Sequence, residues 1–168
     1  MKTKKNIFKL EVDDDDMMED VAQLLFRSPQ PGYMFTDNLN RLYGFALHRI
    51  DDMDLEGAAW PMYSYRDRMD NLKYYLIEKS RTAKACTGWS TGDKLLIIKG
   101  DGAREMAEYI CEDFTDPMPA ESGDLLAEEH ARLRDEMLAD FTVVSLTESQ
   151  QFAAIHTYIE IKRLDLSE

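Results

Sequence analysis

Hydrophobic and polar residues alternate along several short segments of the chain, and this pattern predicts β-strands. In residues 5–12, Phe8, Leu10 and Val12 fall on one face and charged residues fall on the other. Residues 17–27 fit both a helix and a strand that pairs back on the first one. Further strands are expected at residues 45–50, 62–66, 73–79 and 94–99.

The last of these strands is expected at the centre of the sheet. Residues 95–98 are apolar at every position, which is typical of a strand that is buried on both faces. Residues 67–72 are short enough to form a hairpin between the strands at 62–66 and 73–79. Because short connections join antiparallel neighbours, the sequence predicts an antiparallel sheet of about five strands.

Apolar residues at helical spacing predict helices between and after the strands. Thr36 is expected to cap a short helix that runs through Tyr43, with Gly44 at its C-terminal end. Later helices are expected at residues 103–113, at residues 124–139 and from residue 147 onward. We predict a single α+β domain over residues 1–168, with helices packed on one face of the sheet and the apolar faces closing into one interior.

The chain of 168 residues carries a formal net charge of −13. A surface this negative repels nucleic acid backbones and anionic lipid headgroups, so neither nucleic acid nor a membrane is expected as a partner. Lysines within residues 2–9 are followed by a series of acids from Glu11 to Asp20, which weakens any local positive field. The hydrophobic fraction of 44% is that of an ordinary globular protein.

Cysteine content and hydropathy favour a cytoplasmic location. Cys86 and Cys111 are too few for the disulfide framework of a small secreted domain. No apolar run approaches the roughly 18 residues that a membrane-spanning helix needs. Residues 6–11 follow the first lysines and lack the apolar core of a signal peptide. We therefore expect a cytoplasmic protein with reduced thiols.

Residues 88–92 (Gly-Trp-Ser-Thr-Gly) match G-x-S-x-G, the nucleophile turn of many hydrolases. In those enzymes the serine follows a strand and precedes a helix, whereas here a polar loop precedes the motif and a strand follows it. We interpret the segment as a Gly-rich interstrand loop with one anchoring Trp. An enzyme of unrecognised class that uses Ser90, Asp93 or Asp101 with a downstream histidine is the alternative.

Residues 100–102 (Gly-Asp-Gly) follow a predicted strand and open a predicted helix, as a dinucleotide-binding turn does. Glu105 stands where the third glycine of that motif belongs, and its carboxylate would face the pyrophosphate. The preceding strands also form a meander and no parallel βαβ unit. We therefore predict a plain strand-to-helix turn and expect no cofactor.

No metal site is expected from the spacing of possible ligands. His156 and Glu160 are four residues apart and share a helix face, but two ligands do not make a site. His130 falls on an apolar stripe and is interpreted as a core or interface histidine. Residues 13–16 and 51–54 are rich in Asp but lack the EF-hand spacing, and we interpret both as solvated turns.

Aromatic residues gather around one predicted hairpin and the loop that follows it. Because aromatic side chains fit the pleated surface of a strand, we interpret them as packing residues. The same residues, if exposed, would form a protein-binding face. The possible interaction face consists of Trp60, Tyr63, Tyr65, Tyr74 and Trp89.

Several short segments within residues 5–100 occur in the same order as in a known family. They are Leu39-Asn40, Leu42-Tyr43-Gly44, Arg49-Ile50-Asp51-Asp52, Tyr63-Ser64-Tyr65, Tyr74-Tyr75-Leu76-Ile77-Glu78-Lys79-Ser80 and Leu95-Leu96-Ile97-Ile98-Lys99-Gly100. This layout resembles that of the IPExxxVDY proteins, which are short uncharacterised proteins found mainly in Bacteroidetes. The motif that names the family is absent, because residues 87–94 stand in its place. The resemblance implies a small cytoplasmic α+β protein of bacterial origin and supplies no catalytic residue.

The absence of a catalytic constellation in the sequence favours a non-enzymatic function. We expect a protein-binding or adaptor module, which binds either another protein or a second copy of itself. A further hypothesis is an immunity or antitoxin-type protein, whose acidity would neutralise a basic partner.

Overall fold

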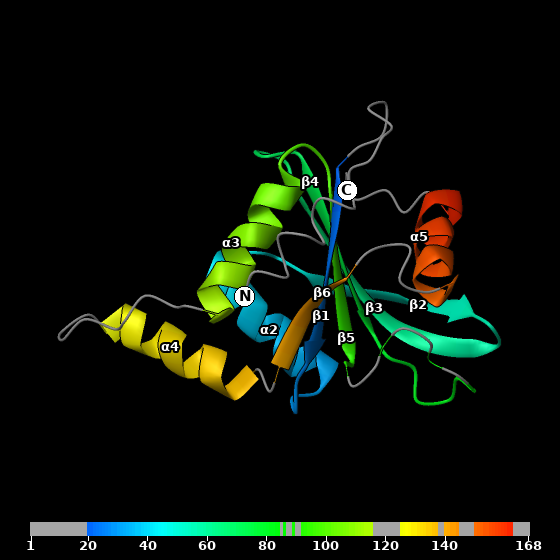
Figure 1. Ribbon diagram of the computed structural model, residues 1–168, viewed down its shortest axis with the longest axis horizontal. Coiled ribbons are helices and arrows are strands. Elements are labelled where there is room, and N and C mark those ends of the chain that lie inside the picture. Colours follow the sequence, from blue (N-terminus) through cyan, green and yellow to red (C-terminus); the bar gives the residue numbers. More distant parts are fainter. Residues whose placement is uncertain are drawn as a thin grey trace.

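The chain forms an α+β fold built on one antiparallel sheet, as predicted, in the computed structural model shown in Figure 1. The structure describes residues 20–84, 86, 89, 92–115, 125–137, 140–144 and 150–162. The strand expected at residues 5–12 and the acidic run at residues 13–16 lie outside these ranges. The strands are β1 (Val21–Arg27), β2 (His48–Leu55), β3 (Ala58–Asp67), β4 (Leu72–Glu78), β5 (Lys94–Lys99) and β6 (Asp140–Val144). Their order across the sheet is β2-β3-β4-β5-β1-β6.

Strand β5 lies inside the sheet, as its apolar run predicted. It pairs with β4 on one side and with β1 on the other, and each of its residues is buried. Leu96 lies opposite Leu76 of β4 and Leu24 of β1, and all three side chains are fully buried. Both faces of β5 therefore contact apolar layers.

Residues 17–27, for which both a helix and a strand were possible, contain strand β1. This strand lies between β5 and β6, with Leu24 opposite Leu96 on one side and Val143 on the other. Every residue of β1 except Arg27 is buried, including Gln23. Because both faces of β1 are covered, the segment shows no regular alternation of polar and apolar residues.

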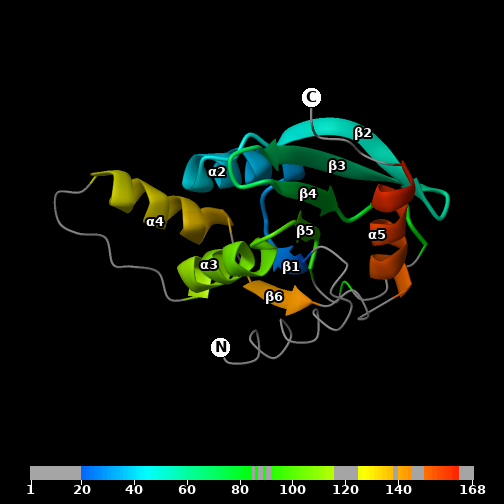
Figure 2. The same ribbon diagram turned by 90° about the horizontal axis from the view of Figure 1, so that it is seen from above.

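The helices lie on both faces of the sheet and not on one, as Figures 1 and 2 show. Helices α2 (Gly32–Tyr43), α3 (Ala103–Thr115) and α4 (Leu125–Met137) cover one face. Helix α5 (Gln150–Lys162) departs from the predicted single layer and packs on the opposite face. The apolar side chains that α5 buries there are Phe152, Ile155 and Ile159.

Each face of the sheet has its own apolar layer, so the predicted single interior is divided in two by the sheet. We call these the α3-side layer and the α5-side layer. Strand β3 contributes to both, because Trp60 and Met62 belong to the α5-side layer while Tyr63 and Tyr65 pack with the α3-side layer. This alternation is the two-residue period of a strand that is covered on both faces.

Helix α2 begins at Gly32, four residues before the predicted cap, so Thr36 is buried within the helix. Its C-terminal end is as predicted: Gly44 has a φ of 72° and donates its N–H to the carbonyl oxygen of Asn40 at 2.8 Å. The Asn40 side chain also accepts a 3.0 Å hydrogen bond from the N–H of Leu47 and donates one to its carbonyl oxygen at 3.1 Å. These bonds fix the chain just before β2.

Candidate functional site

The aromatic residues considered as an interaction face are core residues. Trp60, Tyr63, Tyr74 and Trp89 are at most 5% exposed, and Tyr65 is partly buried. They also lie on different faces of the sheet, the two tryptophans in the α5-side layer and the tyrosines in the α3-side layer. A binding face requires exposed side chains. These residues are instead covered by the helices on the two faces of the sheet, so they are packing residues.

Two residues of the G-x-S-x-G segment, Trp89 and Gly92, are described by the structure, and both pack against the core. Trp89 stacks on Trp60 with ring centroids 5.7 Å apart and meets Phe152 edge-on at 5.5 Å. A Cβ atom added to Gly92 would overlap with the Leu25 side chain, so the position requires glycine. The anchoring role predicted for the tryptophan is confirmed, and the serine of the motif lies outside the described residues.

The described groups of the enzymatic alternative are spread over separate elements, and Ser90 lies outside the described residues. Asp93 and Asp101 flank β5 at its two ends, which are about 20 Å apart at the rise of a strand. His130 is on α4 and His156 is on α5, and these helices lie on opposite faces of the sheet. Among the described residues, no group of three or more His, Cys, Asp or Glu side chains is placed to hold a metal ion.

Residues 100–102 form a strand-to-helix turn, as predicted. Gly100 has a φ of 126°, and a Cβ atom there would lie 2.6 Å from the carbonyl oxygen of Asn71. Both strands that flank β5 run antiparallel to it. This turn therefore lacks the parallel strand–helix–strand setting of a dinucleotide-binding site.

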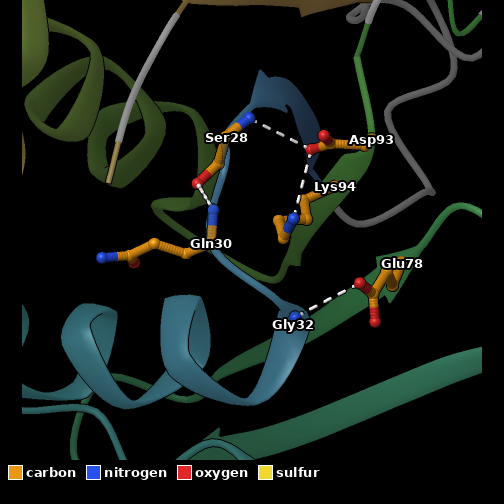
Figure 3. Close-up of polar contacts among 6 residues, drawn as sticks. All are labelled: Ser28, Gln30, Gly32, Glu78, Asp93 and Lys94. Carbon is orange, nitrogen blue, oxygen red and sulfur yellow. Dashed lines mark hydrogen bonds and ion pairs between the residues drawn. The ribbon is translucent and has the colours of Figure 1, made fainter. Parts of the chain in front are cut away.

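A polar cluster joins the end of β1, the start of β5 and the chain that leads into α2 (Figure 3). Asp93 accepts a 3.2 Å hydrogen bond from the backbone N–H of Ser28 and pairs with the ammonium group of Lys94 at 3.3 Å. The Ser28 hydroxyl accepts a 3.1 Å bond from the N–H of Gln30. Lys94 is only 2% exposed, and a buried charge needs such a partner. The cluster holds three elements together, so we assign it a structural role.

Glu78 of β4 occupies the N-terminal end of α2, as Figure 3 shows. Its Oε2 atom accepts a 3.2 Å hydrogen bond from the N–H of Gly32, where the helix dipole favours negative charge. A Cβ atom on Gly32 would lie 2.5 Å from Oε1 of Glu78 and 3.2 Å from the Tyr63 hydroxyl. The protein's own carboxylate therefore fills the position where an external anion would bind.

The acidic run at residues 51–54 lies in strand β2, so its interpretation as a solvated turn was wrong. The register between β2 and β3 shifts between Ile50 and Met53, where β2 contains one residue more than β3. In a regular strand, residues three apart face opposite ways. The bulge lets Ile50 and Met53 both pack in the α5-side layer and leaves Asp51 and Asp52 exposed.

The exposed charge of β2 is mainly negative. Asp51, Asp52 and Asp54 are all exposed. Asp52 pairs with the guanidinium group of Arg49, which also lies 5.6 Å from the ring centroid of Tyr63. The hydrogen bond from Arg49 to Asp52 raises the pKa of the arginine. Within the described ranges, neither Asp51 nor Asp54 forms an ion pair.

The turn after β2 is the sequence signal that would have located this strand. Glu56 and Gly57 have φ values of 58° and 75°, the left-handed conformations of a two-residue hairpin turn. Glycine at the second position of a two-residue connection between strand-like runs is typical of such a turn. The strand expected at residues 45–50 overlaps β2 only at residues 48–50, because the bulge after Ile50 interrupts the two-residue period of the rest.

Known proteins give no guide to function, since no family model, no curated protein and no solved structure matches the chain. The part of the chain that the structure describes contains no helix long and apolar enough to cross a membrane. The candidate site is therefore taken from the structure alone. It is strand β2 with its exposed carboxylates, Asp51, Asp52 and Asp54.

Proposed function

We propose that the protein is a non-enzymatic protein-binding or adaptor module whose partner presents positive charge to β2. The observation that carries the proposal is the placement of Asp51, Asp52 and Asp54 on an edge strand, exposed to solvent. Complementary charge accelerates association and selects among partners. The net charge of −13 adds an attraction for basic partners at longer range.

The backbone of β2 supports this role because core contacts hold it in place. Met53 is fully buried, and the indole Nε1 of Trp60 donates a 3.1 Å hydrogen bond to the carbonyl oxygen of Leu55. Trp60 itself is fully buried in the α5-side layer. A surface that is already ordered loses little conformational entropy when it binds.

The same strand supports a second, narrower proposal, an immunity or antitoxin-type protein. Such a protein would place the carboxylates of Asp51 and Asp54 against a basic surface of a toxin and block it. The two proposals differ in the nature of the partner. The partner of an immunity or antitoxin-type protein is toxic to the cell, whereas the partner of an adaptor is not. Expression of the identified partner with and without this protein separates them.

Affinity capture from a lysate of the native host tests the proposed function. The variant Asp51→Asn/Asp54→Asn removes two unpaired charges from β2, and Glu105→Gln/Glu112→Gln removes two exposed charges from α3 as the matched control. We expect a basic protein that binds the wild type and the control and is lost with the β2 variant. A partner retained equally by all three proteins would contradict the role of β2. Capture of no protein would contradict the function itself.

A further inference from the structure

We infer that the partner binds β2 as an added strand, in the form of an extended segment with lysine or arginine at alternate positions. This inference rests on the proposed function and specifies the conformation and the chemistry of the partner. It is carried by the open edge of the sheet and by the charge that lies along it.

The outer edge of β2 is unpaired by any other described strand. β2 is the last strand on its side of the sheet, and its inner edge pairs with β3 (Figure 2). An edge strand presents free backbone N–H and C=O groups that an incoming strand can bind. Residues 53–55 lie beyond the bulge and pair regularly with β3. This regular part of the edge is where we place the added strand.

The two faces of β2 define the side-chain pattern of the occupant. Met53 and Leu55 pack in the α5-side layer, so Asp54 between them faces the opposite side and is exposed. Side chains on the same face of neighbouring strands lie about 5 Å apart, and opposite charges there stabilise the pair. Asp52, two residues before Asp54, is also exposed and by the same alternation faces the same side, so cationic residues at alternate positions of an added strand would meet these two carboxylates.

Charge argues against a second copy of β2 as the occupant. Pairing two copies of this edge would bring Asp51, Asp52 and Asp54 close to the same carboxylates of the other copy, and like charges on neighbouring strands are destabilising. The net charge of −13 on each chain adds repulsion. Repulsion between carboxylates thus disfavours pairing of β2 with a second copy of β2, while attraction favours a basic segment, and this difference gives specificity.

Three peptides of equal charge separate strand addition from attraction alone. The first is a fluorescein-labelled peptide of alternating lysine and threonine, and the others are N-methylated at every lysine amide or at every threonine amide. Only alternate amides of an added strand face β2. Fluorescence anisotropy should show that one methylated peptide binds about tenfold more weakly or worse, while the other binds like the parent.

Equal affinity of the three peptides would overturn strand addition and leave the proposed function standing, since charge alone would then explain binding. The parent peptide should also bind Asp51→Asn/Asp54→Asn about tenfold more weakly than it binds Glu105→Gln/Glu112→Gln. Equal binding to these two variants would overturn the assignment to β2. Failure of the parent peptide to bind at all, with a partner captured through β2, would overturn strand addition as well.

Discussion

The hydroxyl group of Tyr43 donates a 2.8 Å hydrogen bond to Oδ2 of Asp113 and so joins the C-terminal ends of α2 and α3. Arg134 of α4 reaches the same oxygen at 3.3 Å. In Figures 1 and 2, α4 extends away from the sheet at its N-terminal end, and this contact ties it back to its neighbours. The three residues therefore link the helices that cover one face of the sheet.

Tyr43→Phe should destabilise the protein by about 1–2 kcal/mol, because it removes the hydrogen bond and leaves the Asp113 carboxylate with a single cationic partner. Chemical denaturation measures the change. Tyr109→Phe is the matched control, since the Tyr109 side chain is 58% exposed and its hydroxyl should contribute little. Equal stability of the two variants would contradict the role assigned to Tyr43.

Stability should fall above about pH 10. Burial raises the pKa of Tyr43 and the charge of Asp113 raises it further, and burial also raises the pKa of Tyr74. Tyrosines of the unfolded chain ionise near pH 10, so the unfolded state loses protons while these folded tyrosines keep theirs. The contribution is complete below that pH and declines as the pH rises. The free energy of unfolding should decline less steeply with pH for Tyr43→Phe than for the wild type. An identical slope for the two proteins would contradict the raised pKa of Tyr43.

Phe152→Ala should lower the free energy of unfolding by about 3–5 kcal/mol, because Phe152 is fully buried. It should also shift the tryptophan emission to the red, because Phe152 covers Trp89 edge-on. Fluorescence during denaturation gives both quantities. Ile161→Ala on the same helix is the control, since Ile161 is 71% exposed. If the emission of Phe152→Ala stayed at its original wavelength, α5 would not shield the tryptophans.

Gly92→Ala should destabilise the fold by about 1–3 kcal/mol, because the new methyl group overlaps with Leu25, which is 4% exposed and confined by the core. Thermal unfolding measures the effect. A variant as stable as the wild type would show that the glycine of the G-x-S-x-G segment is not required for packing.

The local pattern of apolar and polar residues was sufficient to predict an element whose residues are all buried. Residues 95–98 are apolar throughout, so the position of β5 inside the sheet was predictable. Strand β1 was ambiguous because Gln23 interrupts an otherwise apolar segment, and β6 was missed because its five residues are too few to show a period. The side on which α5 packs is likewise a long-range property that a helical stripe does not specify.

The candidate site was only partly visible in the sequence. The acids at residues 51–54 form a visible run of charge in the sequence, but their place on an edge strand depends on pairing with β3 across a bulge. The aromatic residues had a visible packing pattern. Their burial depends on helices covering both faces, which no spacing within the hairpin can show. The role of β2 thus emerges from tertiary structure.

Amide hydrogen exchange of the full chain, with and without its captured partner, tests the role of the acidic edge most directly. Binding at β2 predicts slower exchange of the amides in residues 48–55 and unchanged exchange in residues 103–115 of α3. Slower exchange in α3 or α4, with β2 unchanged, would contradict the claim that the acidic edge strand is the binding surface.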